Sequence, residues 1–126
     1  MNTAVSTPTA PAAVGAYSQA VDTGKLVFCS GQLGIDPASG EMAPGAAAQA
    51  DQAITNLAAV LAAARLTLAD VVKTTVFLAD IADFAEVNAV YADRFMDSVL
   101  PARSAIQAAA LPKAARVEIE AIAARP

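Results

Sequence analysis

Two segments of the chain repeat their apolar residues at the spacing of one helix face. The first stripe predicts a long amphipathic helix and consists of Ala50, Ile54, Leu57, Leu61 and Ala64. The second stripe, in residues 84–95, predicts a shorter helix and consists of Phe84, Val87, Tyr91 and Phe95. Asp83 stands just before this stripe and Glu86 follows three residues later, a spacing that resembles a capping box and places the helix start at Asp83.

Other segments have the β-branched composition or the alternation of strands. Extended character begins at Tyr17 and is strongest in residues 26–30, and the turn formers of residues 22–25 predict a hairpin between the two runs. Residues 71–78 contain no Gly or Pro and predict a strand deep in the sheet. Two final strands are expected around residues 103–109 and 116–123, with a turn at 111–113. The predicted order is β-β-α-β-α-β-β in one domain, residues 1–126, of which 1–12 form an irregular lead-in.

The two predicted helices cover one face of a mixed sheet, so the other face must meet solvent or another chain. In the last strand the apolar side consists of Val117, Ile119, Ala121 and Ala123, and Glu118 and Glu120 point the other way. In residues 71–78, alternation places the even-numbered residues on one face and the odd-numbered residues on the other, and neither face is plainly charged. A semi-polar face on a small, alanine-rich domain predicts closed association of copies of the chain.

Composition narrows the classes of function. The formal net charge is -4, and the few cationic residues are dispersed, so nucleic acid is an unlikely partner. The chain contains no histidine and one cysteine, which argues against histidine-based triads, zinc chemistry and an intrachain disulfide. Cys29 lies inside an apolar strand, where a thiol usually acts as a small hydrophobe. With neither a signal-peptide pattern nor a stretch of membrane-spanning length, a cytoplasmic protein without a membrane partner is expected.

The polar chemistry is concentrated near the C-terminal end. Arg103 follows Pro101 and Ala102 at the start of an extended run, and its guanidinium can present a rigid fork of donors to a planar carboxylate. A small organic acid is therefore the natural ligand. Glu118, if partly buried in a cleft, would have a raised pKa suited to proton exchange with water. Taken alone, an arginine at a strand start is more often a surface or interface ion-pair partner, and glutamates placed like Glu118 and Glu120 are more often the wet side of an edge strand.

Six blocks in the same order give the chain a family resemblance. They are GAYSQA at 15–20, SGQ at 30–32, DVVKTTVFL at 70–78, DFAEVN at 83–88, PARS at 101–104 and VEIEAIA at 117–123. From about Ala10 to its C-terminus the chain resembles the RidA (YjgF/YER057c/UK114) family of imine deaminases. The resemblance implies a chorismate-mutase-like α+β fold and a homotrimer with clefts between subunits. It also implies cofactor-free hydrolysis of reactive 2-imino acids and enamines, such as 2-iminobutanoate and 2-iminopropanoate, to 2-keto acids and ammonia.

Carried over by position, the resemblance assigns roles to individual residues. Arg103 would grip the substrate carboxylate, and Glu118 would hold or activate the attacking water, with Glu120 in support. The substrate pocket would be lined by Tyr17, Ser30, Asn88 and Ala105. No metal or cofactor is implied. Three of these residues also have a structural interpretation. The Tyr17 ring could cover the sheet edge, the Ser30 hydroxyl could hydrogen-bond within the turn at Gly31, and the Asn88 side chain could hydrogen-bond to the backbone from within a helix.

Three positions depart from the family pattern. Ala105 stands where many relatives carry a cysteine, Ala16 where proline is common in them, and Arg65 at a helix end where they often have glycine. A left-handed Arg65 would cost on the order of 1 kcal/mol. Two other functions remain open: a non-catalytic small-acid-binding or holdase-like protein of the same fold, and, less favoured by the negative charge, an endoribonuclease or translation inhibitor. The sequence leaves the preferred imino acid open.

Overall fold

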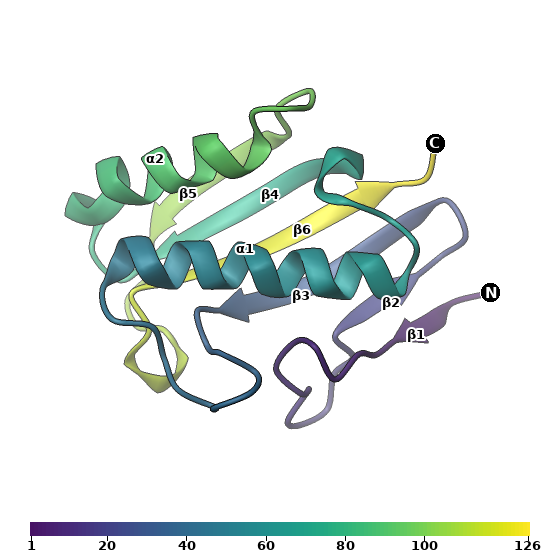
Figure 1. The fold of residues 1–126 in the computed structure, drawn as a ribbon, viewed down its shortest axis with the longest axis horizontal. Helices are drawn as coiled ribbons and strands as arrows, with labels where there is room; N and C mark the ends of the chain where they lie inside the picture. The colour runs from purple at the N-terminus through teal and green to yellow at the C-terminus, as the bar shows by residue number, and fades with distance from the viewer.

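A mixed sheet of six strands forms one layer of the molecule and two helices form the other (Figure 1). The computed structural model describes all residues, Met1–Pro126. In order across the sheet the strands are β1 (Thr3–Val5), β2 (Ala20–Asp22), β3 (Leu26–Leu33), β6 (Val117–Ala124), β4 (Val71–Leu78) and β5 (Ala102–Gln107). The helices are α1 (Ala46–Ala63) and α2 (Phe84–Phe95), and three 3-10 turns complete the fold: η1 (Leu68–Asp70), η2 (Ile81–Asp83) and η3 (Pro112–Ala114).

The strand pairing is antiparallel throughout, except that β4 and β5 run parallel. A mixed sheet in the predicted order is thereby confirmed, with β4 inside the sheet and β2 and β3 as the opening hairpin. The structure corrects the lead-in, because Thr3–Val5 pairs with β2 as the edge strand β1. A three-residue strand held by backbone bonds leaves no alternation for a sequence pattern to detect.

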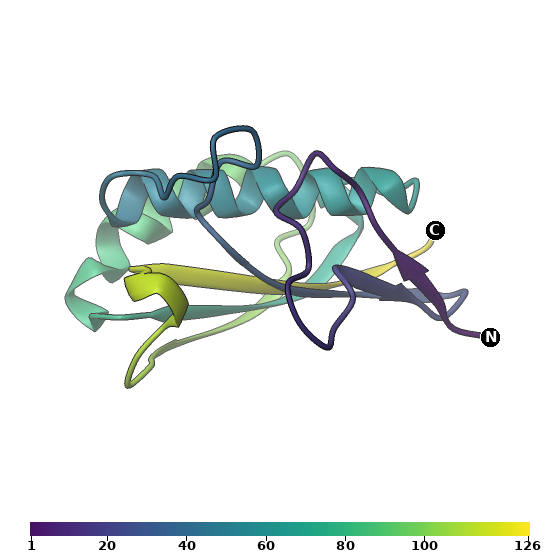
Figure 2. The same ribbon diagram turned by 90° about the horizontal axis from the view of Figure 1, so that it is seen from below.

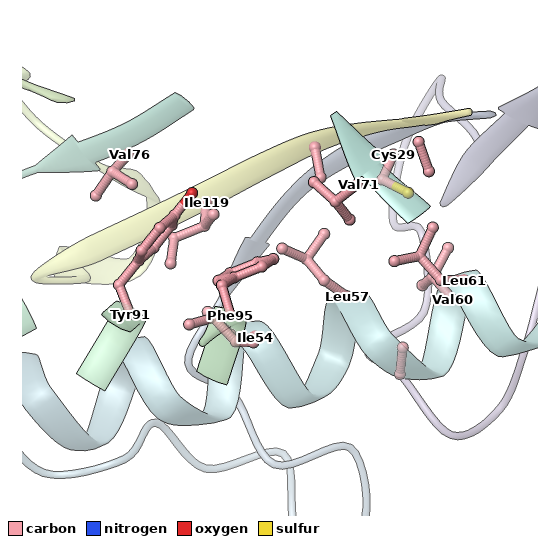
Figure 3. Packing of buried hydrophobic residues seen from close by; sticks show 14 of the residues in the cluster. Cys29, Ile54, Leu57, Val60, Leu61, Val71, Val76, Tyr91, Phe95 and Ile119 are labelled. Atoms are coloured by element: carbon pink, nitrogen blue, oxygen red, sulfur yellow. The ribbon is translucent and has the colours of Figure 1, made fainter. Parts of the chain in front are cut away.

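Both helices lie on the same face of the sheet, and the opposite face is bare of helices (Figure 2). The core fills the space between the layers, with side chains of α1 and α2 pointing to the inner face of the sheet (Figure 3). All five residues of the α1 stripe are buried, which confirms that prediction. In α2 the three later residues of the stripe are buried, but Phe84 is only half-buried. No helix has both the length and the apolar sequence that crossing a membrane requires.

The alternation predicted for the last strand is confirmed, since Val117, Ile119, Ala121 and Ala123 are all buried. In β4 the prediction fails at one point. Val71 is buried and Val72 is 47% exposed, the reverse of what strict alternation with Thr74 predicts. The register against β6 shifts between Val71 and Lys73, so a bulge exchanges the faces of the first two residues.

The two helix ends differ from each other in how well the sequence predicts them. The capping box at Asp83 is wrong: Asp83 makes no side-chain cap and instead accepts hydrogen bonds from the Arg116 guanidinium at 2.7 and 3.1 Å. At the end of α1 the left-handed residue is confirmed, with Arg65 at φ 63°. The amide of Arg65 donates to the Ala62 carbonyl and that of Leu66 to the Leu61 carbonyl, which is a Schellman motif.

Candidate active site

Arg103 lies on β5, the edge strand next to α2. It pairs in register with Thr74, and residues paired in this way share a face, so its side chain lies on the helix side of the sheet. The guanidinium carbon is 4.8 Å from the ring centroid of Tyr91 and 5.3 Å from that of Phe84. Nη1 donates to Oδ1 of Asn88 at 2.7 Å, the only hydrogen bond of this side chain. The Nε and Nη2 donors therefore remain free to bind a ligand.

Glu118 lies on β6 and points to the bare face of the sheet, where it pairs across the strands with Phe77. It is half-buried in a hollow of about 620 Å³, and Glu120 lines the same hollow. Burial, and then the negative charge of Glu120, raise the pKa of Glu118 above its ordinary value of 4.5. None of the chain's three ion pairs includes it. Glu118 is thus a partly desolvated carboxylate without a cationic partner.

Gly31 makes room for this carboxylate. A Cβ on Gly31 would lie 2.0 Å from Oε2 of Glu118, so the carboxylate occupies the space of a missing side chain. Sequence reasoning did not assign Gly31 a role, although a glycine inside a strand is a signal for close approach by another group.

Tyr17 and Ser30 line the same hollow as Glu118. The Tyr17 side chain is 54% exposed, and the Ser30 hydroxyl donates to the Ser18 carbonyl at 2.7 Å. The segment that carries Tyr17 is anchored by Gln19, another residue that the sequence patterns missed. Its buried carboxamide accepts from the Thr7 amide at 2.7 Å and donates to the Pro11 carbonyl at 2.7 Å.

A second hollow of about 470 Å³ adjoins the first and shares Tyr17, Ser30 and Glu120 with it. Cys29 contributes to its wall, but burial raises the pKa of this thiol to about 12. A neutral thiol is a poor nucleophile, in keeping with its predicted structural role. At the rim of the first hollow, Lys113 has a left-handed backbone with φ 56°. No group of three or more His, Cys, Asp or Glu side chains is placed to hold a metal ion.

The predicted site residues fall into two groups within one chain. Glu118, Tyr17 and Ser30 meet on the bare face of the sheet, whereas Arg103 and Asn88 meet on the helix side at the β5 edge. Ala105 pairs with Val76 and packs against the core, so its side chain belongs to the helix side. We name the first group the glutamate hollow and the second the arginine edge. A single chain does not bring the two together.

Comparison with known proteins supplies a family. The model of the family described as endoribonuclease L-PSP matches residues 7–125. A Bos taurus protein named 2-iminobutanoate/2-iminopropanoate deaminase is 57% identical over 120 residues, which cover 94% of this chain and 87% of that protein. The crystal structure of the YjgF gene product from E. coli is 46% identical, has a TM-score of 0.96, and covers 98% of this chain and 99% of that one.

The structure of E. coli TdcF with bound serine is similar too, at 42% identity and a TM-score of 0.96, with 98% of this chain and 99% of that chain covered. Sequence and backbone thus agree over nearly the whole length of the chain, and the α+β fold expected from the resemblance is confirmed. The chain belongs to the RidA family, which the endoribonuclease L-PSP model describes.

Proposed function

We propose that the chain hydrolyses 2-iminobutanoate and 2-iminopropanoate to the corresponding 2-keto acids and ammonia. The observation that carries the proposal is a complementary pair of groups: Arg103 has free donors for a carboxylate, and Glu118 is a desolvated carboxylate with a raised pKa. The high identity to a protein named for this reaction supports it. A hollow of about 620 Å³, and a similar protein with bound serine, support a small acid as the ligand.

The reaction needs positioning and proton transfer, because an imine conjugated to a carboxylate is already electrophilic. Arg103 binds the carboxylate through its free N–H donors. Glu118 takes a proton from water as the water oxygen bonds to C2 of the imine. It then gives that proton to the nitrogen, which becomes an amino group on C2. The proton of the C2 hydroxyl next passes to this nitrogen through Glu118, so that the C–N bond breaks with ammonia as the leaving group and the hydroxyl becomes the keto group. Imine and water are thereby converted to keto acid and ammonia, and Glu118 is regenerated as the carboxylate.

The site is completed between copies of the chain in a homotrimer, with the arginine edge of one protomer against the glutamate hollow of the next. The bare face of the sheet supports this arrangement, because four large apolar side chains are exposed there: Leu26, Phe28, Val72 and Ile106. Association of copies through this face would bury them. The number three comes from the family resemblance.

Cleavage of RNA is less well supported by the same structure. Three of the cations are already held by aspartates in the pairs Arg94–Asp51, Arg116–Asp83 and Arg125–Asp22. The glutamate hollow has two carboxylates, which repel a phosphate backbone. These charges favour a small anionic ligand held by one arginine.

A trapping assay tests the proposed reaction. A PLP-dependent threonine dehydratase generates 2-iminobutanoate, semicarbazide traps it, and the purified protein competes with the trap. Wild type is expected to suppress trapping, and Arg103→Ala to lose kcat/KM by about 100-fold or more. Glu118→Gln is expected to lose about 100-fold to 10,000-fold in kcat, since it keeps the shape and removes the base. Well-folded wild type that leaves trapping unchanged would overturn the proposal in favour of ligand binding without turnover.

A further inference from the structure

We infer that Phe84 and Tyr91 are positioning residues for the substrate's carboxylate: their ring faces hold the Arg103 guanidinium with its free donors directed at the ligand. The inference rests on the carboxylate-binding role proposed for Arg103. It assigns a function to two residues that the hydrophobic pattern treats only as part of the core stripe of α2.

Three residues on one side of α2 contact the Arg103 guanidinium. Phe84, Asn88 and Tyr91 are spaced by four and three residues, so they lie on the same side of the helix. Two of them present ring faces at 5.3 and 4.8 Å from the guanidinium carbon, and the third accepts one hydrogen bond at 2.7 Å. A planar cation held by two ring faces and one hydrogen bond has little freedom to turn.

The Tyr91 ring is held in place by contacts with the sheet and with Phe95. Tyr91 projects from α2 toward the sheet (Figure 3), and its hydroxyl lies 2.6 Å from that of Thr74. Thr74 is 1% exposed and is the register partner of Arg103 on β4. The ring also packs against Phe95 with centroids 4.6 Å apart. The platform under Arg103 is therefore tied to the sheet and to the core, which makes it rigid.

The kind of partner distinguishes Arg103 from the other arginines near α2 and β6. Arg94, Arg116 and Arg125 are each paired with an aspartate. A carboxylate from the chain's own sequence would neutralise the cation and occupy the donors that a ligand needs. Ring faces restrain a guanidinium through its π surface and leave its N–H edge free. An aromatic platform is thus the partner expected of an arginine that must stay available to an external acid.

The test uses binding of 2-ketobutanoate, measured by isothermal titration calorimetry, so that it does not depend on turnover. Phe84→Leu keeps apolar volume and removes a ring face. We expect it to weaken binding about three- to tenfold. Phe84→Tyr restores a ring and should recover most of that loss. Val90→Ala, on another side of α2 and partly buried, is the matched control: it should lower the melting temperature and leave the dissociation constant unchanged.

A double-mutant cycle separates positioning from a structural effect. In the Arg103→Ala background, Phe84→Leu should have no further effect on keto acid binding, because the ring acts only through the guanidinium. Equal effects of Phe84→Leu in both backgrounds would overturn the inference, as would an unchanged dissociation constant in the single variant. A wild type that fails to bind the keto acid would overturn it as well.

Different results would contradict the proposed hydrolysis and the inferred role of Phe84 and Tyr91. Wild type that binds 2-ketobutanoate through the platform but does not hydrolyse the imine contradicts the proposed reaction and leaves the platform intact. Wild type that hydrolyses the imine, with the KM of Phe84→Leu unchanged, contradicts the platform and leaves the reaction intact. A rise in KM with kcat nearly constant is the kinetic result expected from the platform, because orientation of Arg103 affects substrate and transition state alike.

Discussion

The arginine edge and the glutamate hollow hold their charged groups in opposite ways. Arg103 is exposed near the start of the edge strand β5, yet two rings and an asparagine restrain it. Glu118 is half-buried on an inner strand, yet it has no cationic partner, and its pKa is raised by burial and by Glu120. The cation is restrained while its donors stay free, and the carboxylate is destabilised in its charged form.

This difference matches what each group is proposed to do. A group that binds a carboxylate must keep its orientation, which rigid neighbours provide, and its positive charge, which is intrinsic to a guanidinium. A group that exchanges protons must have comparable access to two protonation states, and partial desolvation brings its pKa closer to neutral pH. This contrast supports the proposal that the two regions are two halves of one site.

Mixing two inactive variants tests whether the halves come from different protomers. Arg103→Ala and Glu118→Gln are purified separately, dissociated together in mild denaturant and reassembled. If Arg103 of one protomer serves Glu118 of the next, roughly a quarter of the sites in a random mixture combine two native residues. Activity in the trapping assay should return to about that fraction of wild type.

The control is each variant reassembled alone, which should stay inactive. Continued inactivity of a mixture whose mixed oligomers are verified by native mass spectrometry would contradict a site shared between protomers. In that case Arg103 and Glu118 would have to act at separate places on the chain.

Much of the fold was predictable because it depends on local periodicity. The stripe of α1 and the alternation of β6 follow directly from side-chain spacing, and both are confirmed. The errors occur where residues distant in the sequence determine the local structure. Asp83 was predicted to cap α2, but Arg116, far along the chain, competes for its carboxylate. At Val71 and Val72 the bulge against β6 overrides the alternation of faces, and the sequence of β4 contains no pattern that predicts a bulge.

The site was predictable only as a set of residues. Motif resemblance selected Arg103 and Glu118, but their opposite faces follow from strand pairing: Arg103 pairs with Thr74, and Glu118 with Phe77. The supports of the two charges also come from tertiary packing. Gly31 under Glu118, and the rings under Arg103, are visible only once β3 meets β6 and α2 meets β5.

The thermal stability of Glu118→Gln tests whether the glutamate hollow destabilises the charged form of its carboxylate. Because the folded-state pKa of Glu118 lies above its ordinary value, the charged form is less favourable in the folded chain than in the unfolded one. The carboxylate therefore lowers the free energy of unfolding at neutral pH, and this penalty disappears as pH falls below the unfolded-state pKa. Glu118→Gln should melt a few degrees above wild type at pH 7 and at the same temperature near pH 3.

Glu120→Gln is the matched control for the origin of this penalty, since it removes the neighbouring charge and keeps Glu118. It should lower the pKa of Glu118, because the second cause of the shift is gone, and so move the acid limb of the kcat/KM profile to lower pH. A melting temperature of Glu118→Gln at or below that of wild type at pH 7 would show that the carboxylate is stabilised in the hollow, contrary to the contrast with Arg103.

Arg65→Gly gives the smallest expected effect and tests strain outside both regions. Arg65 holds the left-handed position of the Schellman motif at φ 63°, where a side chain costs about 1 kcal/mol. Glycine removes that strain but loses more entropy on folding, so we expect a net gain of about 0.5 kcal/mol, or about 2 °C in melting temperature at fixed protein concentration. The KM and kcat of the imine reaction should not change, because Arg65 lies at the far end of α1, away from the glutamate hollow and the arginine edge. A melting temperature that does not rise would mean that contacts of the Arg65 side chain offset the strain. A changed KM would mean that substrate binding also depends on a region outside the glutamate hollow and the arginine edge.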